Sequence, residues 1–207
     1  AAMTATLLSS SSFGALIAGD VAIVGFQASG VGADSVSFVT FVDLAPGTVL
    51  YFTDNGWTGS AFRGVTATDG DGNENLMRFT AANTIVAGTI IGSRTSSADY
   101  AWALSGLVGP GTSTYAQLSL SSSGEQVTIL ESTNLANPIF SDFTALYNFD
   151  NTSAYESASS SSTGSLAPGL VQGTSAVLLT SSLNSATFNL NTLASGTQAE
   201  WLAAIGD

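Results

Sequence analysis

The sequence predicts an all-β fold, an antiparallel β-sandwich with one short carboxy-terminal helix. Short segments rich in Val, Ile, Phe and Thr recur along the chain, bounded by Gly, Asn, Asp or Ser. Turn signals such as Pro46-Gly47 and Asn55-Gly56 separate consecutive segments. The regular alternation of strands and helices that predicts a parallel α/β fold is missing. Many short strands in one chain are typical of a sandwich or a barrel.

The predicted strands follow one another from the first turn onward. Residues 21–26 form a continuous apolar run, and residues 35–42 alternate polar and apolar before becoming wholly apolar. Residues 48–53 follow the Pro46-Gly47 turn. The other candidates share this composition and are residues 76–80, 84–91, 115–120, 126–131, 139–146, 176–180 and 186–190.

Two further segments differ from the strands. Residues 197–205 predict the helix, which Ser195 or Thr197 can cap and Gly206 can end, with Glu200 in the first turn. Residues 153–167 are serine-rich and of low complexity, which predicts a loop.

Composition argues against several classes of function. The 207 residues include 15 Asp and Glu but only three Lys and Arg, all of them Arg, with no Cys and no His, and the net charge is −12. The chain therefore lacks a thiol nucleophile, a Ser-His-Asp triad and the usual ligands of zinc. The negative charge disfavours nucleic acids and anionic membrane surfaces and favours divalent cations. We expect a protein that is not an enzyme and has no nucleic-acid partner; scattered carboxylates allow an acid–base hydrolase, but no motif singles out a pair.

The same composition predicts export from a bacterium, to the extracellular space or the cell surface. The chain carries 31 Ser and 24 Thr, and only 9% of its residues are charged. The longest apolar stretch, residues 13–26, is interrupted by Gly14, Gly19 and Asp20 and is too short to span a bilayer. We therefore expect no membrane insertion.

An amino-terminal extension, residues 1–18, precedes the predicted sandwich domain at residues 19–207. Its first residues alternate in polarity, and the serines at 9–12 form a hinge. Twelve extended residues reach about 40 Å, which is about the diameter of the domain. The segment therefore has two interpretations, a strand donated to the next copy in a homopolymer or an end that is loose or paired within its own sheet. The candidate donor residues are Met3, Thr4, Ala5, Thr6, Leu7 and Leu8.

A polar cluster is a candidate calcium site, because hard oxygens at alternate positions of a loop suit this ion. Its candidate ligands are Asp69, Asp71, Asn73 and Glu74. The spacing fails the EF-hand pattern, and a solvated turn between strands is the alternative.

A carboxylate and an aromatic ring, Asp54 and Trp57, follow the third predicted strand and could belong to a carbohydrate platform. An Asx turn with Trp57 packed onto the core is the favoured interpretation. Trp102 and Trp201 are isolated in sequence and are more typical of a core.

Segments spread over the chain carry a family resemblance. They are residues 19–26, 36–57, 121–130, 138–140 and 198–205. Together they resemble the lamin-tail-like β-sandwich domain of secreted and surface proteins of cyanobacteria and other bacteria, over about residues 19–207. The resemblance implies an immunoglobulin-like or lamin-tail-like sandwich in an adhesion, matrix or surface-display module, and it carries over no catalytic residue.

The sequence therefore supports two functional hypotheses. The first is a secreted structural subunit that assembles with itself into an extracellular filament or a biofilm-matrix fibre by donating its amino-terminal strand. The second is a calcium-dependent adhesion or carbohydrate-binding module with an extracellular polysaccharide as its partner.

Overall fold

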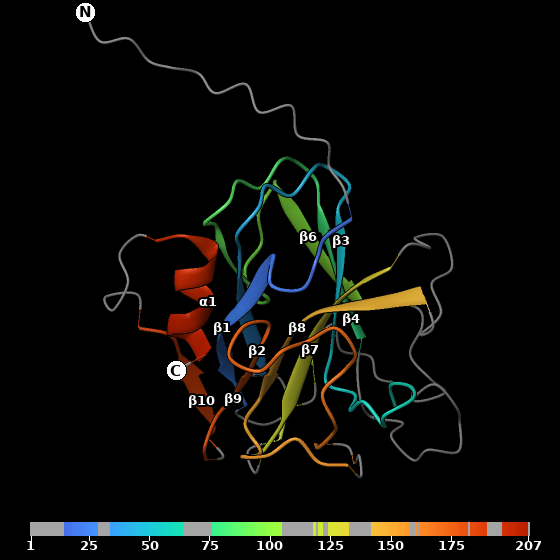
Figure 1. Cartoon of the computed structure of the whole chain (residues 1–207). Coiled ribbons are helices and arrows are strands. Elements are labelled where there is room, and N and C mark those ends of the chain that lie inside the picture. Colours follow the sequence, from blue (N-terminus) through green and yellow to red (C-terminus); the bar gives the residue numbers. More distant parts are fainter. Residues whose placement is uncertain are drawn as a thin grey trace, which may run out of the picture.

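Two β-sheets pack face to face and one helix lies beside them (Figure 1). The computed structural model describes residues 15–28, 34–63, 76–104, 118, 120–121, 124–132, 142–157, 160, 162–181, 183–189 and 196–206. The predicted all-β sandwich with one short carboxy-terminal helix is confirmed. No helix among the described residues is long and apolar enough to cross a membrane.

The smaller sheet has four strands in the order β10-β1-β2-β5. Its strands are β1 (Val21–Gln27), β2 (Ser35–Thr40), β5 (Ile90–Gly92) and β10 (Ser185–Thr187). All neighbours are antiparallel, and a β-bulge interrupts β1 between Ile23 and Gly25. The bulge turns an extra side chain, that of Val24, toward the outer face of the sheet.

The larger sheet has six strands in the order β6-β4-β3-β7-β8-β9. Its strands are β3 (Val49–Thr53), β4 (Leu76–Ala81), β6 (Tyr100–Leu104), β7 (Gln126–Ser132), β8 (Phe143–Asp150) and β9 (Ala176–Leu178). Only one pair within this part of the structure, β8 with β9, is parallel. The sheet is therefore mixed at this edge, which the sequence patterns did not predict.

The main core lies between the two sheets. Phe38 of β2 contacts three aromatic rings of the larger sheet, Phe52 at 5.2 Å, Phe79 at 5.3 Å and Trp102 at 6.2 Å between ring centroids. The three Phe residues belong to one buried cluster that spans both sheets, and the partly buried Trp102 packs against it. Trp102 is therefore a core residue, as its isolated position predicts.

A second apolar cluster lies on the outer face of the larger sheet. There Trp57 packs edge-on against Phe62, with ring centroids 5.0 Å apart. The amide and the side-chain nitrogen of Asn55 both donate hydrogen bonds to the hydroxyl of Thr53, at 3.1 and 2.8 Å. Trp57 therefore packs onto the body of the protein as predicted, but the acceptor in this turn is the hydroxyl of Thr53, so these bonds form an ST turn where an Asx turn was predicted.

Several predicted strand boundaries were wrong. The predicted strand 84–91 shrinks to β5 with an isolated bridge at Ile85, because a turn at Ala87-Gly88 interrupts it and Gly88 has a φ of +85°. The strand predicted at 139–146 is β8, which extends to Asp150. β6 was not predicted, and residues 115–117 of another predicted strand lie outside the described residues.

The helix α1 (Gln198–Gly206) begins with a reciprocal capping box. The amide of Thr197 donates to the Glu200 carboxylate at 2.8 Å, and the amide of Glu200 donates to the Thr197 hydroxyl at 3.3 Å. Gln198 donates a hydrogen bond of 2.7 Å to the carbonyl of Gly19, and Trp201 contacts Phe188 at 5.7 Å between rings. These contacts fix the helix beside the smaller sheet.

Candidate functional site

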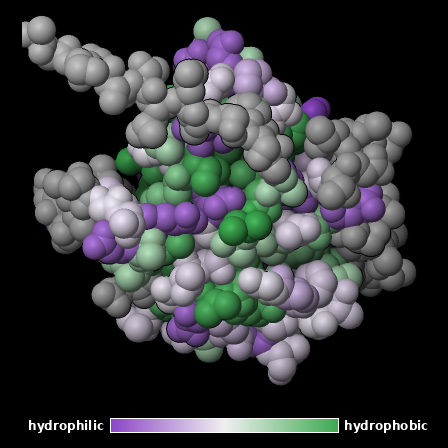
Figure 2. Space-filling view, turned by 45° about the horizontal axis from the view of Figure 1, so that its top comes forward, coloured by the Kyte–Doolittle hydropathy of each residue, from purple (hydrophilic) through white to green (hydrophobic). Residues whose placement is uncertain are grey.

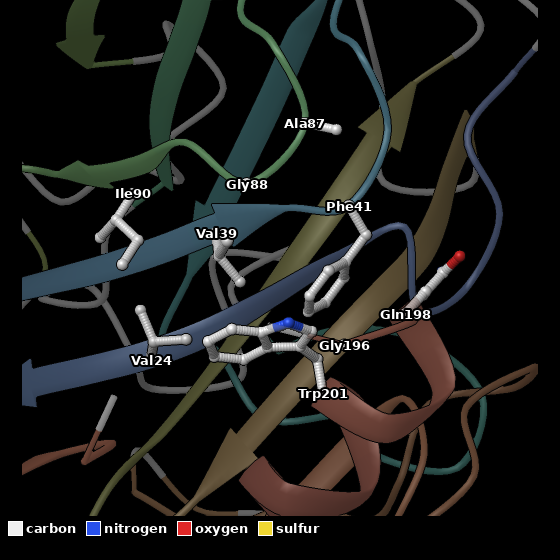
Figure 3. A pocket seen from close by; sticks show the side chains of 9 residues that line it. All are labelled: Val24, Val39, Phe41, Ala87, Gly88, Ile90, Gly196, Gln198 and Trp201. Atoms are coloured by element: carbon white, nitrogen blue, oxygen red, sulfur yellow. The ribbon is translucent and has the colours of Figure 1, made fainter. Parts of the chain in front are cut away.

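An apolar pocket of about 280 Å³ opens beside helix α1 on the outer face of the smaller sheet (Figure 3). The main side chains that line it are Val24, Val39, Phe41, Ile90, Gln198 and Trp201. Three strands supply its floor, because Val39 and Ile90 are cross-strand partners and Val24 lies at the bulge of the next strand. Helix α1 supplies Trp201.

The pocket is closed toward the middle of the sheet and open toward its edge. Val24 and Val39 are only 6% and 5% exposed, whereas Ile90 is 44% exposed. Val86, in the turn that precedes β5, is 60% exposed. We call this surface, from Val24 through Val39 to Ile90, the groove. Its apolar floor therefore extends to the edge of the sheet.

The edge of the groove is the edge strand β5. The amide of Ser93 donates to the carbonyl of Val36 at 2.8 Å, and the amide of Thr40 donates to the carbonyl of Thr89 at 3.3 Å. In an antiparallel ladder the backbone groups of successive residues point to opposite sides. The N–H and C=O of Ile90 are therefore directed away from β2, toward the side on which another strand can be added.

The chemistry of the groove favours aliphatic groups. Among the residues that line the pocket, only the amide of Gln198 and the indole N–H of Trp201 are polar side-chain groups. A sugar needs several hydrogen-bonding groups placed around it, whereas an aliphatic side chain needs apolar contact alone. In the view of Figure 2, apolar residues reach the surface in separate patches between polar ones. The groove is suited to side chains of a docked peptide segment.

A second unusual region lies at one end of the larger sheet. Asp54 follows β3, Glu125 precedes β7 and Asp150 ends β8, so antiparallel pairing brings the three carboxyl groups to the same end. All three residues are buried, with exposed fractions of 0%, 2% and 0%. Burial, followed by the nearby charge of Asp54 and more weakly that of Asp150, raises the pKa of Glu125 from 4.5 to about 9.

The described residues of the serine-rich segment 153–167, namely 153–157, 160 and 162–167, include a part that lies against the outer face of the larger sheet near this end. Ser165 donates hydrogen bonds of 2.9 Å to the carbonyl of Trp57 from both its amide and its hydroxyl. A Cβ on Gly56 would lie 2.4 Å from the carbonyl oxygen of Thr163, and one on Gly164 would lie 2.8 Å from the amide nitrogen of Trp57. Two glycines thus allow the two backbones to touch, and the predicted loop packs closely on the sheet.

Most of the site residues predicted from the sequence lie outside the described residues. These are the donor residues Met3, Thr4, Ala5, Thr6, Leu7 and Leu8 and the calcium candidates Asp69, Asp71, Asn73 and Glu74. Within the described ranges, no group of three or more acidic side chains has an arrangement that holds a metal ion.

The groove itself was not predicted. Val24, Val39 and Ile90 each belong to a different strand, and their alternation identifies a buried face without indicating how much of it the helix covers. The sequence feature that could have indicated the groove is the pair of apolar residues Val86 and Ile90 in the segment 84–91. In the structure both side chains are exposed.

Comparison with known proteins adds no family to this description. No protein-family model matches the chain, and neither the curated proteins nor the solved structures contain a match. The fold and the groove therefore define the class of this protein as a β-sandwich with an apolar groove beside an edge strand.

Proposed function

We propose that the protein is a secreted, non-catalytic structural subunit that assembles with itself by strand donation. The amino-terminal segment of one copy would add to the β5 edge of the next copy and cover its groove. The observation that carries this proposal is the groove itself, whose apolar floor ends at an edge strand with an outward-facing Ile90. Adding a strand to an exposed sheet edge is a common mode of peptide recognition.

The periodicity of the amino-terminal segment suits this acceptor. Side chains of an added strand alternate between the two faces of the sheet. In an added strand, Met3, Ala5 and Leu7 would share one face, so one of them could extend the cross-strand row of Val39 and Ile90 while the other two lie on either side of it. Burying a Met or Leu side chain contributes about 1.5–3 kcal/mol. The backbone hydrogen bonds of the added strand contribute about 1 kcal/mol each.

The symmetry of such a contact leads to a filament. The donor segment and the acceptor groove are different surfaces of the same chain, so the contact between copies is head-to-tail. A head-to-tail contact that does not close into a ring adds copies without limit. The Ser- and Thr-rich composition and the near absence of cationic side chains suit a surface exposed outside the cell.

The test compares the full chain with three variants by negative-stain electron microscopy and analytical ultracentrifugation. The first variant lacks residues 1–12, and the second carries Ile90→Asp in the groove. The third, Val171→Asp, is the matched control, because Val171 is 59% exposed and does not line the groove. We expect fibres from the full chain and from the control, and dispersed particles from the other two.

Each part of the proposal has its own contrary result. Fibres from the variant without residues 1–12 would exclude donation of this segment, and fibres from Ile90→Asp would exclude the groove as its acceptor. Dispersed particles from the full chain would exclude self-assembly. Thermal unfolding of every variant tests whether that variant is folded. We expect Ile90→Asp to fold, because this side chain is 44% exposed in the wild type. A synthetic peptide of residues 1–12 should shorten or prevent the fibres.

A further inference from the structure

Five buried polar atoms without a hydrogen-bond partner, which we call the polar layer, belong to the end of β3, to β7 and β8 and to the segment that covers the larger sheet. They are Asn55 Oδ1, Gln126 Nε2, Asn148 Oδ1, Asp150 Oδ2 and Glu156 Oε2. Buried polar atoms of native proteins are nearly always paired with protein groups or with ordered water. Leaving five of them unpaired would cost a large part of the net stability of a domain. These atoms therefore need partners, which ordered water or a bound ion can supply.

Strand pairing explains why these groups lie together. Gln126 and Asp150 are cross-strand partners on β7 and β8. Asn148 donates a hydrogen bond of 2.9 Å to the hydroxyl of Thr128, which is its own cross-strand partner. Because side chains two residues apart on a strand share a face, Asn148 and Asp150 point to the same side. That side is opposite to the main core, which contains Tyr147 and Phe149.

The covering segment brings Glu156 over the same face. The amide of Glu156 donates to the carbonyl of Gly164 at 3.0 Å. A Cβ on Gly164 would in turn lie 3.0 Å from Oε1 of Gln126, so this part of the segment rests directly on the sheet. Burial raises the pKa of Asp150 to about 6, and the nearby negative charge of Glu156 makes a smaller contribution in the same direction.

The chemistry of the layer is that of a cation site. Four of the five unpartnered atoms are oxygens that can only accept or coordinate, and two of them belong to carboxyl groups. Asp150 is 0% exposed and Asn148 is 3% exposed, so bulk water does not reach these two side chains. Hard oxygen ligands from carboxylates and carboxamides, in flexible geometry, are typical of calcium.

We propose that Asp150 Oδ2, Glu156 Oε2 and Asn148 Oδ1 bind one calcium ion, with water completing the coordination. The site would fasten the serine-rich segment 153–167 to the larger sheet, because Glu156 belongs to that segment and the other two ligands belong to β8. It is separate from the acidic cluster at residues 69–74, and it does not depend on the proposed self-assembly.

The test is a titration of the chelator-treated full chain with CaCl₂, followed by calorimetry and thermal unfolding. We expect one site per chain and a Tm that rises by about 5 °C or more at a hundredfold excess over Kd. MgCl₂ should bind more weakly, because Mg²⁺ demands a rigid octahedral shell. Glu156→Gln, which keeps the size of a half-buried side chain, should weaken calcium binding at least tenfold. Asp150→Asn should do the same if it folds.

Two control variants separate this site from other acidic groups. Glu200→Gln changes an exposed carboxylate and should leave the calcium shift unchanged. The double variant Asp69→Asn/Asp71→Asn should also keep it. If the calcium-induced rise in Tm were lost in that double variant but kept in Glu156→Gln, the ion would be assigned to residues 69–74 and the proposal would be overturned. The absence of any shift with the full chain at millimolar calcium would also overturn it.

Discussion

Glu125 should make the protein less stable as the pH rises from acid to neutral. Its carboxyl group accepts hydrogen bonds from the amides of Ser121 and Gln126, at 2.9 and 3.2 Å, but it is only 2% exposed. Burial, and then the nearby charge of Asp54, raise its pKa from 4.5 to about 9. The folded protein therefore holds this proton more tightly than the unfolded chain does. The stabilisation is complete below about pH 4.5 and is lost as the pH rises toward 9.

The variant Glu125→Gln isolates this effect. Between pH 4.5 and 9, one proton held only by the folded state changes the free energy of unfolding by at most about 1.4 kcal/mol per pH unit. By pH 7 the wild type has therefore lost up to about 3 kcal/mol through this group. The glutamine cannot ionise, but its amide nitrogen replaces one acceptor, and the lost hydrogen bond costs about 1 kcal/mol. We expect the variant to be about 1 kcal/mol less stable than the wild type at pH 4 and about 2 kcal/mol more stable at pH 7.

Urea unfolding followed by tryptophan fluorescence at each pH unit from 4 to 8 measures this difference. The other buried acids are present in both proteins, so subtracting one curve from the other leaves the contribution of Glu125 together with its electrostatic coupling to Asp54. The two stability curves should cross between pH 5 and 6, by the same estimate of about 1.4 kcal/mol per unit. Glu200→Gln, at an exposed carboxylate, should give a curve that does not cross the wild type. Parallel curves for Glu125→Gln and the wild type would refute the reasoning.

Two further substitutions test the packing of the covering segment and the helix. Gly56→Ala places a Cβ 2.4 Å from the backbone oxygen of Thr163, and it should lower the free energy of unfolding by about 3 kcal/mol. In Gly25→Ala, the control, the nearest atom is 3.6 Å away, and urea unfolding should show a change below about 1 kcal/mol. Thr197→Ala removes the hydroxyl that accepts the amide of Glu200. It should cost about 1 kcal/mol, seen as a Tm lower by about 2–4 °C; an unchanged Tm would contradict the capping role.

The sequence predicted individual strands best where a dense apolar pattern has no competing turn residue. β1 and β3 are almost wholly buried and match their predicted segments closely. β6 was missed because it contains two alanines and its strand geometry depends on pairing with β4, where Phe79 is opposite Trp102. The segment 84–91 was predicted as one strand because Ile85 and Val86 favour strands locally, but the turn at Gly88 ends that pattern.

The candidate sites were harder to predict from the sequence than the strands, because each site combines residues that are far apart along the chain. In the sequence, the three acids Asp54, Glu125 and Asp150 are spread over 96 residues, and only strand pairing brings them to one end of a sheet. The sequence describes 153–167 as a polar loop, whereas the close approach of Gly56 to Thr163 and the hydrogen bonds of Ser165 to Trp57 show that this part of it packs against the sheet. The groove likewise needs the position of α1, which covers one part of the sheet's outer face and leaves another part open.

Composition and local pattern by themselves determined the fold class, the single short helix and its capping, and the absence of Cys, His and Lys chemistry. These properties depend on side-chain type and on the periodicity of two residues along a strand, which are local and present in the sequence. Tertiary structure alone decided the order of the strands, the parallel edge pair of β8 and β9, the burial of the acids and the place of the groove. Each of these depends on which strand ends and faces meet, and a periodicity of two is the same for every possible partner.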